Sequence, residues 1–125
     1  MSLAVANRYA RALVDVVAAP GSGVEPRQAG LQLRSFETLL DSAADLRNVL
    51  QSPAVPTARK RGVVTRLCGI LGISPLVRNF LCVVVDHRRL ALLSAMREAF
   101  ETFLDERLGL VRARVASAAE MSGEQ

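Results

Sequence analysis

The segment from Leu3 to Val17 has more apolar surface than a helix on a small domain needs for its own core. At about 100° per residue, its apolar side chains form two adjacent stripes that span roughly 220°, whereas a surface helix buries about 100°. The first stripe contains Leu3, Ala6, Ala10, Leu13, Val14 and Val17, and the second contains Val5, Tyr9, Ala12 and Val16. Arg8, Arg11 and Asp15 leave a narrow polar face. The second stripe is therefore covered either by the chain's own bundle or by a partner.

Five further segments repeat apolar residues at helical spacing. The second helix is expected from about Glu25 to Leu40, with Pro26 in its first turn and Leu31, Phe36, Leu39 and Leu40 buried. Asp41 or Ser42 is expected to cap a short third helix, with Asp45 completing a capping box. The fourth helix is expected to begin at a Thr57 cap and to stop at Gly72, and the sixth to run from about Leu90 to Leu108.

The fifth helix, predicted from Leu76 to His87, follows a Ser74-Pro75 start signal. Its run Phe80 to Val85 alone is also compatible with a buried strand, but the start signal and the length favour a helix. Its apolar positions spread over roughly 200° of the circumference. Two helices with surplus apolar surface in one small domain predict a shared groove with an open edge.

The pattern changes after Gly109. Residues Val111 to Val115 alternate apolar and polar side chains, which predicts a β-strand, and Ser122 to Gln125 read as the opening of a capping box. A lone strand is not stable by itself, so we expect a second domain that continues beyond this sequence. The predicted fold class is all-α, with a six-helix domain over residues 1–107 and a linker, strand and helix start of an incomplete domain over 108–125.

The chain offers no set of residues for catalysis, and no cofactor or metal is expected. His87 is the single histidine, and Gly21 and Gly23 lack the Lys-Ser/Thr ending of a nucleotide-binding loop. Cys68 and Cys82 lie among apolar residues and are expected to be buried free thiols. No apolar run approaches the ~20 residues of a membrane span, and no signal peptide is recognisable. We therefore expect a non-catalytic cytoplasmic protein.

Two other functions remain open, and the first is suggested by the net charge of +4. A basic helical RNA- or DNA-binding domain would use cationic side chains as phosphate contacts, and its affinity would fall steeply with salt. Those side chains would be Arg59, Lys60, Arg61, Arg66, Arg88 and Arg89. Alternatively, the surplus apolar stripes pair with a second copy of the chain. The cationic residues are scattered, which favours an ordinary solvated surface over a phosphate track.

Several short motifs, in this order, resemble those of the delta subunit of the F-type ATP synthase, the oligomycin-sensitivity-conferring protein family. They are Ala6-Asn7-Arg8-Tyr9-Ala10-Arg11-Ala12-Leu13, Leu50-Gln51-Ser52-Pro53 with Lys60, Asn79-Phe80-Leu81 leading to Arg89-Leu90, and Gly109 with Ala113-Arg114-Val115-Ala116-Ser117-Ala118. The resemblance covers essentially the whole sequence, and the family protein is longer. It implies that the part present is the N-terminal six-helix domain.

The resemblance also implies a mechanical function in ATP synthesis and hydrogen ion transport. The family's domain is a stator component that grips the N-terminal helix of an alpha subunit between its first and fifth helices, so that the catalytic head does not turn with the central stalk. The implied partner-helix site is Val5, Arg8, Tyr9, Ala12, Val16, Leu76, Asn79 and Val83. The missing C-terminal region would reach the stalk b subunits, which places the protein at the cytoplasmic face of the bacterial plasma membrane as a peripheral component.

Overall fold

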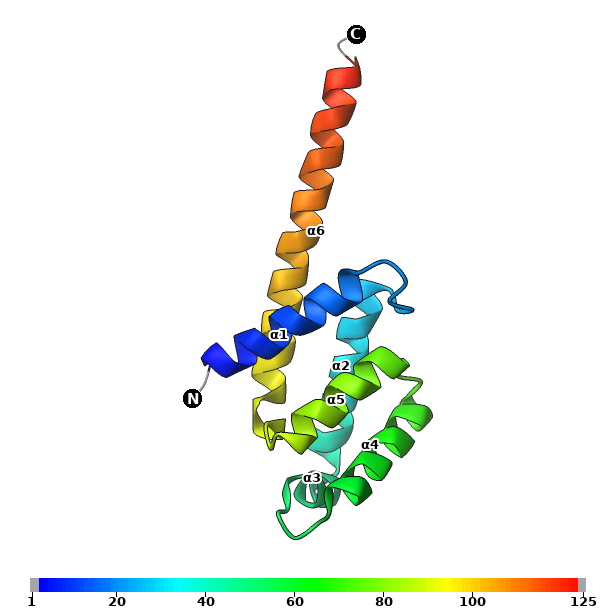
Figure 1. The fold of residues 1–125 in the computed structure, drawn as a ribbon, viewed down its shortest axis with the longest axis vertical. Coiled ribbons are helices and arrows are strands. Elements are labelled where there is room, and N and C mark those ends of the chain that lie inside the picture. The colour runs from blue at the N-terminus through cyan, green and yellow to red at the C-terminus, as the bar shows by residue number, and fades with distance from the viewer. Residues whose placement is uncertain (1–2, 124–125) are drawn as a thin grey trace.

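The computed structural model describes residues 3–123, and all of its regular elements are helices (Figure 1). The elements are α1 (Leu3–Ala18), α2 (Pro26–Ser42), α3 (Ala44–Gln51), α4 (Thr57–Leu71), α5 (Pro75–Asp86), the short 3-10 turn η1 (Leu90–Leu92) and α6 (Leu93–Gly123). The six predicted α-helices are therefore confirmed within these residues. None of the described helices is both long enough and apolar enough to cross a membrane.

The core is mostly aliphatic, and most of its residues come from α1, α2, α5 and α6. The first stripe of α1 is buried as predicted, except that Leu3 is 72% exposed at the start of the helix. Two aromatic residues, Phe36 of α2 and Phe100 of α6, are completely buried in the same cluster. Because the first stripe already fills the core side of α1, the second stripe is left on a different side of the helix.

The helix α2 buries only part of the predicted set of residues. Leu33, Phe36 and Leu40 are buried, but Leu31 is 54% exposed and Leu39 is only half-buried. Leu31 stands two positions before Leu33, which turns its side chain about 200° away from the core-facing stripe. The prediction that Leu31 is buried is therefore wrong.

Two of the predicted helix starts are also wrong. Helix α3 begins at Ala44 after an Ala43 cap that makes no side-chain hydrogen bond, and the Ser42 hydroxyl instead donates to the Leu39 carbonyl within α2. Helix α4 takes Pro56 as its cap residue because Pro56 is extended, so Thr57 is already helical. Two other predicted helix ends are confirmed. Ser74 is the N-cap of α5 with Pro75 as its first helical residue, and α4 stops at Gly72, which is left-handed.

The C-terminal part of α6 replaces the predicted strand. Residues 111–115 continue the helix to Gly123, and this part extends beyond the other helices (Figure 1). A helix satisfies its backbone hydrogen bonds locally, whereas a strand needs a neighbour, so the alternating pattern does not produce a strand there. Residues 124–125 of the predicted capping box lie outside the described residues. The division into domains stays a prediction.

The turn after α5 contains a strained residue. Arg88 has a φ of 57°, and the Arg89 amide bonds the Val84 carbonyl at 2.9 Å, so Arg88 occupies the left-handed position at which helices usually place glycine. We expect Arg88→Gly to raise the free energy of unfolding by about 1 kcal/mol, because it removes the Cβ clash. Urea unfolding followed by circular dichroism measures this change, and a loss of stability would contradict the assignment.

Candidate functional site

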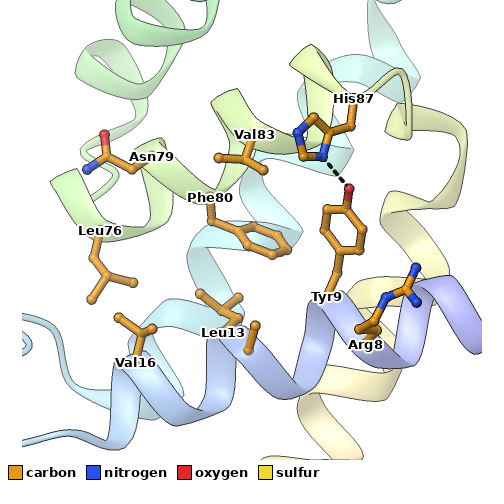
Figure 2. A pocket seen from close by; sticks show the side chains of 10 residues that line it. Arg8, Tyr9, Leu13, Val16, Leu76, Asn79, Phe80, Val83 and His87 are labelled. Carbon is orange, nitrogen blue, oxygen red and sulfur yellow. Dashed lines mark hydrogen bonds between the residues drawn. The ribbon is translucent and has the colours of Figure 1, made fainter.

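An apolar groove of about 480 Å³ lies between α1 and α5 (Figure 2). This volume is in the range of well-formed ligand sites. The groove is lined by Arg8, Tyr9, Ala12, Leu13, Val16, Leu76, Asn79, Phe80, Val83 and His87. None of these lining residues is an acid.

The two walls of the groove are each held from behind by another helix. On α1, the Arg11 guanidinium lies 4.1 Å from the centre of the Phe103 ring of α6, and Asp15 accepts a hydrogen bond from Arg107 of α6 at 2.6 Å. On α5, Asp86 accepts a hydrogen bond from Arg61 Nε of α4 at 2.9 Å. The backing helices occupy the far sides of α1 and α5, so the groove sides stay open.

The walls of the groove carry exposed apolar side chains. Val16 on α1 is 51% exposed and Val83 on α5 is 43% exposed, although both are large hydrophobic residues. Leu13 is buried and forms the floor, where it also belongs to the core. Exposed apolar side chains on both walls of a concave surface are typical of an interaction site rather than of a random surface.

A polar pair closes one end of the groove. The Tyr9 hydroxyl and His87 Nδ1 share a hydrogen bond of 2.6 Å that joins α1 to the end of α5 (Figure 2). The Tyr9 ring also makes an edge contact with the Phe80 ring, with the ring centres 6.5 Å apart. Tyr9 is therefore fixed in place from two directions and presents a rigid aromatic surface to the groove.

The structure brings together seven of the eight predicted site residues. Arg8, Tyr9, Ala12, Val16, Leu76, Asn79 and Val83 line the groove, whereas Val5 does not. Val5 lies one helical turn before Tyr9, beyond the point where His87 ends the opposite wall. That these eight residues bind a partner helix is not tested by this arrangement and stays a prediction.

Sequence reasoning missed three lining residues. The helical spacing places Leu13 in the core stripe alone, but a residue at the edge of that stripe can contact both the core and the groove. Phe80 belongs to the apolar arc predicted for the fifth helix, so the signal for it was present. His87 was expected only at the helix end, and its contact with Tyr9 spans 78 positions, which no local pattern reveals.

The cysteines do not form a reactive centre. Cys68 is buried and Cys82 is half-buried, so the prediction of buried thiols holds fully for Cys68 alone. Burial, with a smaller effect of the nearby Cys82, raises the pKa of Cys68 to about 11. Its thiol is therefore protonated at neutral pH and is a poor nucleophile. Within residues 3–123 no cluster of His, Cys, Asp or Glu is arranged to hold a metal ion.

The fold and the groove define an all-α domain of the kind that can receive an amphipathic helix on its surface. The sequence matches the family described as ATP synthase delta (OSCP) subunit over residues 5–125. The chain therefore belongs to the ATP synthase delta (OSCP) subunit family.

Bacterial relatives support this assignment. The protein named ATP synthase subunit delta from Koribacter versatilis is 34% identical over 120 residues, which are 96% of this chain and 66% of the relative. Proteins of the same name from Acidobacterium capsulatum and Desulforudis audaxviator are each 38% identical, over 92% and 95% of this chain and 63% of each relative. The chain thus spans just under two thirds of the length of these curated relatives.

Proposed function

We propose that this chain is a non-catalytic stator subunit of a rotary ATP synthase that binds the N-terminal helix of an alpha subunit in the groove between α1 and α5. The observation that carries this proposal is the groove itself, which is apolar, open and lined by two helices. A helix laid in such a groove uses side chains at i, i+3, i+4 and i+7 as anchors. The family assignment supplies the complex in which such a helix would be found.

Burial of apolar side chains would make the contact between the groove and the partner helix a tight one. Covering the exposed parts of Val16 and Val83 contributes about 1 kcal/mol each, and Tyr9 adds a rigid aromatic anchor. The rest of the groove excludes water around these anchors. In the assembled enzyme, rotation of the central stalk exerts torque on the catalytic head, and the clamp keeps the head from turning with it.

We further propose that the chain joins the catalytic head to the peripheral stalk. The stalk b subunits would be further partners of the protein within that complex. The protein would then be a peripheral component at the cytoplasmic face of the plasma membrane, joined to the membrane only through the complex. The chain itself would need no cofactor.

The nucleic-acid alternative is weakened by two of its six candidate residues. Arg61 is paired with Asp86, and Lys60 is only 6% exposed. The Lys60 side chain would have to leave its buried position to meet a phosphate, and the charge of Arg61 is already balanced by Asp86. The proposed groove, in contrast, needs no rearrangement to receive a helix.

Calorimetric titration with a synthetic peptide of the alpha-subunit N-terminus tests the proposal. We expect the double variant Arg59→Ala with Arg66→Ala to bind this peptide within about twofold of the unchanged chain, because the groove binds through apolar surface and neither arginine lines it. Both arginines are exposed on α4, away from the groove. A large loss of affinity in the double variant would favour electrostatic binding on α4, and no binding by the unchanged chain would contradict the clamp.

A further inference from the structure

The charged side chains of α1 differ in whether they are already used within the domain. Arg11 stacks on Phe103, and Asp15 is paired with Arg107, so both face α6. Arg8 instead lies beside the groove (Figure 2). Among the described residues, no carboxylate lies within ion-pairing distance of the Arg8 guanidinium.

The charge that lines the groove is positive and lies at one end only (Figure 2). The lining contains the Arg8 cation and no carboxylate, and its other ionisable groups are the Tyr9 hydroxyl and the His87 imidazole. All three lie at the same end, whereas Val16 and Leu76 lie at the opposite, apolar end (Figure 2). A helix that enters the groove therefore meets a positive charge at one end only.

We infer that Arg8 is a specificity residue that pairs with a carboxylate flanking one end of the partner helix's apolar stripe. This inference rests on the proposed function, because it concerns the same groove. Opposite charges across the rim of an interface select partners and set the register, whereas the apolar core of the interface supplies most of the affinity. The preferred occupant is thus an amphipathic helix with an Asp or Glu at one end, and that end lies next to the Tyr9–His87 pair.

The charge reversal Arg8→Glu provides the test, with the alpha-subunit N-terminal peptide as the probe. Arg8 is exposed, so the variant should keep the helical circular dichroism of the unchanged chain. We expect its affinity for the peptide to fall about tenfold at 50 mM salt and only about twofold at 500 mM, because salt screens an exposed pair. The control Arg66→Glu changes the same charge on α4, away from the groove, and should alter the affinity less than twofold at both salt concentrations.

Peptide variants then identify the paired residue. Each Asp or Glu of the peptide is changed in turn to Lys, and one of these changes should restore tight binding to the Arg8→Glu chain while weakening binding to the unchanged chain. Equal binding by Arg8→Glu and the unchanged chain would overturn the inference and leave the groove intact as a binding site. Failure of the unchanged chain to bind the peptide would contradict the proposed function, and the inference with it.

Discussion

Tyr9→Asp is expected to abolish binding of the alpha-subunit N-terminal peptide, with a loss of at least about 100-fold in affinity. Tyr9 is the aromatic anchor of the groove and is held by Phe80 and His87. An aspartate there would place a carboxylate against the apolar face of the incoming helix, and an unpaired charge in an apolar interface is costly. Calorimetric titration measures the affinity, and circular dichroism measures the helical content, which should be unchanged.

A second variant separates binding from folding. Val83→Asp changes an exposed residue on the opposite wall and should weaken the peptide to a similar degree without unfolding the domain. Ile70→Asp is the matched control, because Ile70 is 72% exposed on α4 and does not line the groove. If Tyr9→Asp unfolds the domain and Val83→Asp binds normally, then the second stripe of α1 is part of the core and the groove is not a binding site.

Phe100→Ala is expected to reduce the free energy of unfolding by about 3–5 kcal/mol, because it leaves a cavity in the core. The Phe100 side chain is completely buried on α6, and its Cε2 lies 3.6 Å from the position a Cβ would occupy on Gly30 of α2. The close approach of the α2 backbone means that neighbouring side chains cannot easily refill the space. Urea unfolding followed by circular dichroism gives the change in free energy.

Phe103→Ala is the control on the same helix. Phe103 is only half-buried and packs under the Arg11 guanidinium, so its loss should cost clearly less than the loss of Phe100. Equal costs for the two variants would show that Phe100 is not the centre of the contact between α2 and α6.

Local periodicity was sufficient to predict the helices and much of the groove. The two stripes on α1 separate in the structure as the spacing requires, since Ala6, Ala10 and Val14 are buried while Tyr9 and Val16 line the groove. Leu76 and Val83, which belong to the surplus apolar arc of the fifth helix, likewise line the groove. Spacing alone determines which residues share a helix face, and this was enough to place the two walls.

Features that depend on distant parts of the chain were not predictable in the same way. The bond between Tyr9 and His87 joins two helix ends, and the exposure of Leu31 depends on which side of α2 meets α6. The strand predicted near Val111 was wrong because a period of two over five residues is a weak signal when no partner strand is available. Val5 was included in the site because periodicity does not reveal where the opposite wall ends.

Methyl resonances of the 125-residue chain, recorded during titration with the alpha-subunit N-terminal peptide, test the clamp most directly. We expect the resonances of Val16, Leu76 and Val83 to shift as the peptide is added, while those of Leu31 and Ile70, exposed elsewhere on the domain, stay in place. Shifts confined to Leu31 or Ile70, or an absence of shifts at Val16 and Val83 at saturating peptide, would contradict it.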